Sequence, residues 1–210
     1  MTTTSLPEPW LTIYLERKEA IHARLDDFSN IPPEEYFYEL LFCILTPQSK
    51  AENADTVIQK LKADNFLDKG FDPMPYLRDR RHYIRFHNVK SNRLLHIRTI
   101  YPSLYPILTG KNDDITVLRE KVLAMIPGLG LKESSHFLRN IGVKGLVILD
   151  RHILKHLKEL KIIGRIPKSL TPKRYFAIER RWLKYSRDVG IPMDELDLLF
   201  WSMETGEIRK

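Results

Sequence analysis

Apolar residues along most of this chain recur at intervals of three and four positions, which is the spacing of an amphipathic helix. The segment PPEEYFYELLFCILT (32 to 46) also opens with prolines and glutamates, as helices often do, and ENADTVIQKLKADNF (52 to 66) repeats the pattern with a polar face. The Asn-Gly and Asp-Gly pairs that commonly join two strands are absent from the sequence. We therefore expect an all-α fold.

Proline and glycine mark the expected helix boundaries. They indicate turns at 72–75, 102–106, 164–167 and 190–192. A further turn, PGLG, separates two short predicted helices at 116–126 and 131–142. No internal repeat and no low-complexity linker interrupts the pattern, so we expect one or two compact domains with a hairpin of helices at about 116–142.

The chain is basic and long enough to bury a core. Of its 210 residues 43% are hydrophobic, and 34 Lys and Arg outnumber 27 Asp and Glu, for a net charge of +7 and a pI near 9.4. This balance favours a polyanionic partner such as nucleic acid over an acidic small molecule. Basic proteins without such a partner are also common, so charge alone leaves both alternatives open.

Cysteine content and hydropathy indicate the cellular compartment in which the protein is expected. The one cysteine, Cys43, excludes an internal disulfide and a four-cysteine zinc or iron–sulfur site, and its setting in LLFCILT predicts a buried structural thiol. There is no apolar run long enough to span a membrane and no signal-peptide pattern at the amino terminus. We expect an intracellular protein that does not enter a membrane.

The PGLG turn has a possible ligand. Gly128 and Gly130 carry no Cβ, so an anion such as a phosphate could approach the amide groups at the start of the following helix. The helix dipole would help to hold that anion. The alternative is a corner between two helices that contacts no ligand.

Two ionisable residues follow the turn. Lys132 falls in the first turn of the predicted helix, where the dipole disfavours a positive side chain and so favours the free amine that a lysine nucleophile needs. Asp150 lies 18 residues further on, directly before the amphipathic segment RHILKHLKELK. It could be only the N-cap of that helix, or its carboxylate could take a proton or stabilise a cationic sugar.

The segment IPGLGLKESSHFLRNIG followed by ILDRHI resembles the helix-hairpin-helix DNA glycosylase superfamily. The resemblance implies that residues 1–210 form a single glycosylase unit of two helical subdomains, with the active site in the cleft between them. It also implies that the amino- and carboxy-terminal segments share one subdomain. It implies that Lys132 attacks the sugar C1′ of a flipped nucleotide, that a Schiff base forms, and that β-elimination nicks the strand, with Asp150 as the catalytic carboxylate. The similar segment LFCILTPQSKAENA would place Gln48 and Ser49 near the gap left by the base.

Three features resemble one branch of that superfamily, the archaeal-type 8-oxoguanine DNA glycosylases. The chain lacks the cysteines of a four-cysteine cluster, contains an R-F-x-N-x-K core within YIRFHNVKSNRLLHI, and ends in ELDLLFWSMETGEIRK. In that branch a Phe and a Trp sandwich the oxidised base and a terminal carboxylate helps to recognise it, roles that fall on Phe86, Trp201 and Lys210. The resemblance further implies double-stranded DNA with oxidised guanine as partner, no metal or redox cofactor, a monomer, and a prokaryotic, archaeal-type source.

The residues themselves leave other interpretations open. Trp201 follows the apolar run LDLLF and could be a core tryptophan. Phe86 lies in a basic stretch, 78–98, where seven Lys or Arg and three His accompany one acid, a composition that suits either a solvated face or base stacking beside phosphate contacts. A second basic stretch spans 165–187. At the level of function, a helix-hairpin-helix glycosylase for another damaged or mismatched base and a non-catalytic DNA-binding protein remain the alternatives.

Overall fold

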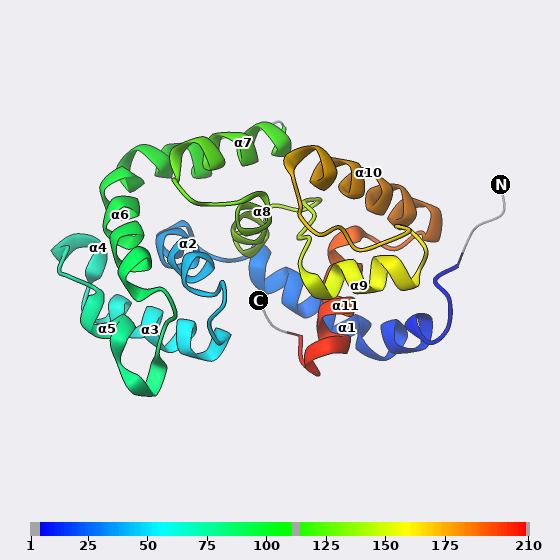
Figure 1. Ribbon diagram of the computed structural model, residues 1–210, viewed down its shortest axis with the longest axis horizontal. Helices are drawn as coiled ribbons and strands as arrows, with labels where there is room; N and C mark the ends of the chain where they lie inside the picture. Colours follow the sequence, from blue (N-terminus) through cyan, green and yellow to red (C-terminus); the bar gives the residue numbers. More distant parts are fainter. Residues whose placement is uncertain (1–4, 111–113, 209–210) are drawn as a thin grey trace. The chain divides into compact units, whose positions relative to one another are not determined.

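The computed structural model describes residues 5–110 and 114–208 (Figure 1). Every regular element in those two ranges is a helix, so the prediction of an all-α fold is confirmed. The α-helices are α1 (Trp10–Ser29), α2 (Tyr36–Leu45), α3 (Ala51–Ala63), α4 (Phe66–Lys69), α5 (Met74–Arg78), α6 (His87–Thr109), α7 (Ile115–Met125), α8 (Leu131–Asn140), α9 (Arg151–Glu159), α10 (Pro172–Val189) and α11 (Met193–Thr205). Two short 3₁₀ helices are η1 (Pro33–Glu35) and η2 (Arg80–His82).

The chain divides into two compact units. The central unit comprises residues 31–137, and the terminal unit combines the segment that ends at Asn30 with the segment that begins at Leu138. The boundary therefore falls inside α8, between Phe137 and Leu138. The elements from η1 to α7 and most of α8 belong to the central unit, whereas α1 and α9 to α11 belong to the terminal unit.

An aromatic cluster forms part of the core of the central unit. Phe37 of α2 has its ring centroid 4.9 Å from that of Tyr101 on α6 and 6.2 Å from that of Phe66 on α4. α2 packs against both α3 and α6, and α6 also contacts α5 and α7. Cys43 is fully buried on α2, which confirms the prediction of a buried thiol.

The prediction of a turn at 102–106 is wrong, because Pro102 and Pro106 lie inside α6. Each proline removes one backbone donor from the helix. The helix nevertheless continues, since Tyr101, Leu104 and Leu108 are buried at helical spacing on the same face. Burial of that face outweighs the local preference of proline for a break.

The terminal unit is organised around α11, which contacts α1, α9 and α10. Residues Met193 to Phe200 of α11 are all buried, and the Phe200 ring lies 5.2 Å, centroid to centroid, from the fully buried Trp182 of α10. In the described part of the chain, no helix combines the length and the apolar character that a membrane span requires.

Candidate active site

The hairpin forms as the glycines predict, although both ends of α7 lie one residue earlier than predicted and α8 is shorter. Gly128 has a φ of +79°, a left-handed conformation that favours glycine, and the Leu129 amide donates to the Ile126 carbonyl at 3.2 Å to close the turn. α8 ends at Asn140, two residues before the predicted end, because Gly142 adopts a φ of +89°. Its neighbour, the Val143 amide, then bonds back to the carbonyl of Leu138 at 3.0 Å, the pattern of a glycine-terminated helix.

Gly130 serves a different purpose from Gly128. Its carbonyl accepts the first bond of α8, from the Ser134 amide at 2.9 Å, so Gly130 is the N-cap residue. Its backbone conformation is one that any residue could adopt. A Cβ at this position would, however, lie 2.7 Å from Oε2 of Glu133, so the absence of a side chain makes room for that carboxylate.

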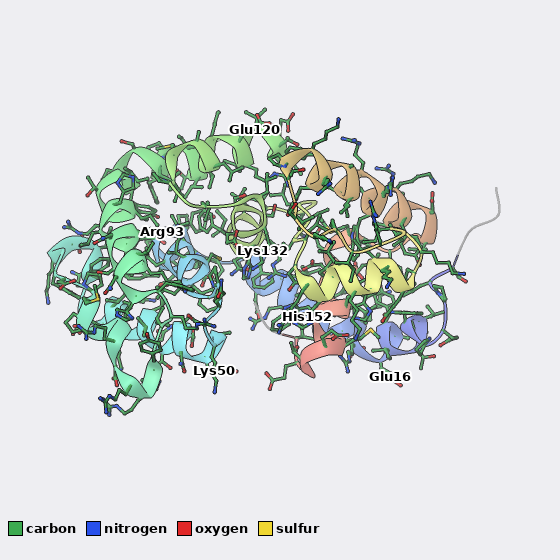
Figure 2. The ribbon with its side chains drawn as sticks, in the orientation of Figure 1. Glu16, Lys50, Arg93, Glu120, Lys132 and His152 are labelled. Carbon is green, nitrogen blue, oxygen red and sulfur yellow. The ribbon has the colours of Figure 1, made fainter. Side chains whose placement is uncertain are left out.

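Lys132 is the second residue of α8 (Figure 2). Its side chain is 29% exposed, which leaves the amine within reach of a substrate. The nearest carboxylate oxygen is Oε1 of Glu133, 3.9 Å from Nζ and too far for a hydrogen bond. Among the residues that the structure describes, the Lys132 amine makes no hydrogen bond.

Asp150 caps α9, as the sequence predicted. Its Oδ1 accepts hydrogen bonds from the amides of His152 and Ile153, each at 2.8 Å. Within residues 5–110 and 114–208 its other oxygen, Oδ2, accepts no hydrogen bond. The carboxylate therefore has one oxygen committed to the helix and one available for chemistry. Asp150 belongs to the terminal unit, whereas Lys132 belongs to the central unit.

A buried lysine holds the loop that carries Gln48 and Ser49. Gln48 is exposed and has a φ of +58°, which is uncommon for a residue with a side chain. Lys90, on α6, donates from Nζ to the carbonyls of Leu45 and Pro47, each at 2.7 Å, and to Oγ of Ser49 at 3.2 Å. No carboxylate among the described residues pairs with it. Burial, with smaller contributions from two nearby arginines, lowers the pKa of Lys90 to about 8.

Phe86 lies beside this loop at the start of α6. The residue is 53% exposed, its φ is +58°, and the Arg85 guanidinium lies 5.5 Å from the ring centroid. Ser49 joins the two segments, because its Oγ also accepts a hydrogen bond from the Arg85 amide at 3.1 Å. The structure thus brings Gln48, Ser49 and Phe86 together, with Lys90 beneath them.

The remaining predicted residues fall at the end of the chain. Trp201 lies on α11 and is partly exposed, in contrast to the fully buried Trp182, so it is not a wholly enclosed core residue. Lys210 lies outside the described residues. Phe86 belongs to the central unit and Trp201 to the terminal unit.

Two residues that support these positions escaped prediction. Lys90 occupies the same face of α6 as the buried Leu94 and Ile97, and a lysine within an apolar stripe is the signal that could have identified it. Glu204 lies three residues beyond Trp201 and contacts α9: its Oε1 accepts from Lys155 Nζ at 2.6 Å, and its Oε2 lies 3.5 Å from His152 Nδ1. This contact anchors the end of α11 to the helix that Asp150 caps.

The described residues contain no cluster of three or more His, Cys, Asp or Glu side chains suited to a metal ion. The candidate functional groups of the site are an amine at a glycine hairpin, a helix-capping carboxylate, exposed aromatic side chains and basic side chains. The helical fold of the described residues, a lysine just after the hairpin and an aspartate 18 residues later are together similar to a helix-hairpin-helix glycosylase.

Comparison with known proteins supports this class and identifies the family within it. The family described as 8-oxoguanine DNA glycosylase matches residues 21–191. The 8-oxoguanine DNA glycosylase/AP lyase of Fusobacterium nucleatum is 41% identical over 207 residues, which cover 94% of each chain. The crystal structure of the Methanocaldococcus jannaschii 8-oxoguanine DNA glycosylase superposes with a TM-score of 0.82 at 31% identity, covering 96% of this chain and 95% of that one.

A second structure of the Methanocaldococcus jannaschii enzyme, in complex with 15mer DNA containing 8-oxoguanine, matches with a TM-score of 0.81 at 31% identity, over 95% of this chain and 99% of that chain. The chain belongs to the 8-oxoguanine DNA glycosylase family.

Proposed function

We propose that this protein excises 8-oxoguanine from double-stranded DNA and then nicks the strand at the resulting site. The observation that carries the proposal is the Lys132 amine: it follows the glycine hairpin, is partly exposed and makes no hydrogen bond among the described residues, in a chain of this family. Membership of the family supports the substrate, and the net charge of +7 suits a DNA partner.

In the proposed reaction Lys132 Nζ attacks C1′ of the flipped nucleotide. The bond from C1′ to the base breaks, and the base leaves with the bonding electrons and takes up a proton. The amine loses its protons as a Schiff base forms with the opened sugar. Removal of a proton from C2′ then expels the 3′ phosphate by β-elimination, which cuts the strand, and water releases the enzyme.

Asp150 supplies the negative charge that this reaction needs. A carboxylate near C1′ stabilises the cationic character of the sugar as the base departs, and it can accept a proton from the lysine. The uncommitted Oδ2 supports this role, because the cap at the start of α9 occupies only Oδ1. We propose that Lys132 and Asp150 act on the same nucleotide.

An enzyme that acts on a base must first take it out of the stack. We propose that Gln48 and Ser49 fill the gap, that Gly128 and Gly130 of the hairpin contact phosphate, and that Phe86, Trp201 and Lys210 recognise the base. The exposure of Phe86 and the partial exposure of Trp201 support stacking on a ligand. Relative to guanine, the lesion carries an additional proton on N7 and a carbonyl at C8.

We further propose that the protein acts as an intracellular monomer.

The experiment is strand cleavage on a panel of duplexes, each with one central lesion and otherwise identical in sequence. We expect cleavage at 8-oxoguanine and little at guanine, an oxidised pyrimidine or a mismatch. Preferential cleavage at an oxidised pyrimidine or a mismatch would instead favour a helix-hairpin-helix glycosylase of another specificity. Binding without cleavage of any duplex would favour a non-catalytic DNA-binding protein.

A further inference from the structure

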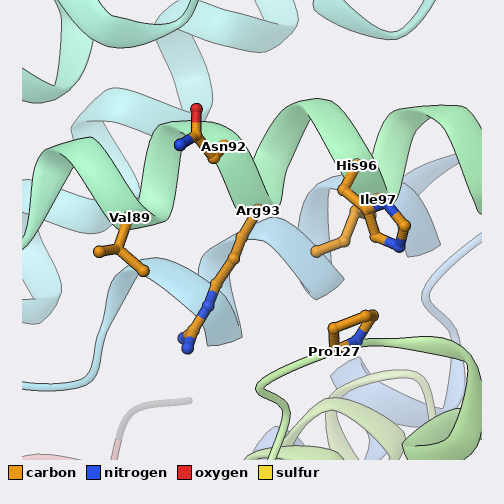
Figure 3. Close-up of a pocket in the computed structure, with 6 residues that line it drawn as sticks. All are labelled: Val89, Asn92, Arg93, His96, Ile97 and Pro127. Carbon is orange, nitrogen blue, oxygen red and sulfur yellow. The ribbon is translucent and has the colours of Figure 1, made fainter.

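A small groove lies between α6 and the hairpin, within the central unit (Figure 3). Its volume is about 260 Å³, and it is lined by Val89, Asn92, Arg93, His96, Ile97 and Pro127. The α6 residues recur every three or four positions, so they share one face of that helix. Pro127 opens the glycine turn and faces them from the other side. None of the predicted site residues lines this groove.

Arg93 is the charged group of the groove, and its charge is not neutralised locally. Its guanidinium makes no hydrogen bond and no ion pair with any described residue, and no acid lines the groove. The side chain lies directly over the hairpin: a Cβ on Gly128 would be 2.4 Å from Nη2. A partly buried cation without a counter-ion is costly in a folded protein, so an anionic ligand would stabilise this arrangement.

The surroundings strengthen the positive potential at this place. Lys90 lies one helical turn earlier on α6, and the charge of Arg93 contributes to the depression of its pKa. Lys90 itself is occupied with the carbonyls of Leu45 and Pro47 and with Ser49. Of these two cations, Arg93 is therefore the one that is free to meet a ligand.

The size and lining of the groove indicate what it would take. Pockets for whole small molecules span roughly 300 to 1,000 Å³, so this one suits a smaller group. Val89, Ile97 and Pro127 offer an apolar surface, and Arg93 and His96 offer hydrogen-bond donors. A sugar–phosphate unit combines those two characters, and a guanidinium can donate two parallel hydrogen bonds to phosphate oxygens.

We propose that this groove binds one sugar–phosphate unit of the DNA backbone, next to the phosphate that the hairpin amides contact. The deoxyribose carbons pack on Val89, Ile97 and Pro127, and Arg93 donates to the phosphate with support from His96. The proposal deepens the proposed function and rests on it, because it takes DNA to be the substrate. It adds a backbone contact beyond the hairpin.

The test is the salt dependence of binding to an undamaged duplex, measured by fluorescence anisotropy between about 50 and about 200 mM salt. Each phosphate neutralised contributes about 0.9 to the slope of log K against log salt concentration, so Arg93→Met should make the slope shallower by about 0.9. Arg93→Lys should restore most of the slope and only part of the affinity, because the charge returns without the bidentate geometry.

Arg24→Met is the matched control. It removes the same charge from an arginine that is already paired, at 3.1 Å, with Asp27, and it should leave the slope unchanged. Circular dichroism establishes that each variant is folded. A slope for Arg93→Met and Arg93→Lys equal to that of the wild type would overturn the proposal.

A further arm distinguishes DNA from a free phosphate compound. The contrary outcome is that inorganic phosphate raises the melting temperature of the wild type but not of Arg93→Met, while the salt-dependence slopes of the two proteins on DNA are equal. In that case the groove binds a free anion and the proposal is overturned. Undamaged DNA keeps this test separate from the proposed function. A wild type that never cleaves 8-oxoguanine would contradict that function, yet an Arg93-dependent slope would still support the groove as a backbone site.

Discussion

The two roles of Asp150, as a helix cap and as a proposed catalytic carboxylate, can be tested separately because they use different oxygens. Oδ1 accepts the two amides at the start of α9, and Oδ2 is uncommitted among the described residues. Asparagine caps helices about as well as aspartate but carries no charge. Asp150→Asn therefore isolates the charge, whereas Asp150→Ala removes both the charge and the cap.

We predict that Asp150→Asn slows base excision by at least about tenfold, since loss of a favourable charge worth about 1.4 kcal/mol in the transition state has that effect. Its melting temperature should stay close to that of the wild type. Asp150→Ala should show a similar loss of rate and a further loss of about 1 kcal/mol of stability. Single-turnover excision and thermal unfolding measure the two quantities. Wild-type rates in Asp150→Asn would leave Asp150 as a helix cap alone.

At the scale of single residues, the structure matches the sequence predictions where the residue type and its neighbours determine the local conformation or burial. The N-cap role of Asp150, the left-handed Gly128 and the buried Cys43 follow from residue type and neighbours. For Lys90 the signal in the sequence is its place in the apolar stripe with Leu94 and Ile97, whereas Arg93 resembles the other six Lys and Arg between 78 and 98. Only packing identifies the arginine that lies over the hairpin.

At the scale of elements, the contact of α6 with the loop between α2 and α3 depends on one buried cation. Lys90 donates to three oxygens of that loop and its flanks, and none of them carries a charge. Its pKa is about 8 in the folded protein, against 10.5 as the ordinary value. Between those two values the unfolded chain binds more protons than the folded one, so the contribution of Lys90 to stability rises with pH.

We predict a pH-dependent difference between the wild type and Lys90→Met. The free energy of unfolding of the wild type, minus that of the variant, should increase by about 1 kcal/mol per pH unit from about pH 8 to about pH 10. Urea unfolding of both proteins across that range measures it, and subtraction removes the titration of other groups. A difference that stays constant over the range would contradict the proposed burial of this charge.

The helices themselves illustrate what periodicity can and cannot predict. α3 and α7 begin within one residue of the predicted start, and α9 begins directly after its predicted cap, Asp150. α6 runs through two prolines, since the burial of Tyr101, Leu104 and Leu108 outweighs the lost backbone bonds. The end of α8 depends on the conformation of Gly142 rather than on composition.

At the scale of the whole molecule, the two ends of the chain belong to one unit. The segment up to Asn30 and the segment from Leu138 together form one compact body, and the residues between them form the other. Lys132 and Asp150 lie on opposite sides of that division, although only 18 residues separate them. Their proposed joint action on one nucleotide would therefore combine groups from both units. The family resemblance suggested this pairing, and periodicity alone could not.

The central claim is that Lys132 forms a covalent bond with the sugar of the lesion. Borohydride reduces a Schiff base to a stable amine, so trapping on a duplex with one 8-oxoguanine reports that bond directly. We predict a cross-linked species for the wild type and for Lys121→Gln, which changes an exposed lysine on α7, and none on undamaged DNA. Lys132→Gln should give no cross-link and still bind the lesion duplex. A cross-link that survives in Lys132→Gln would contradict the account.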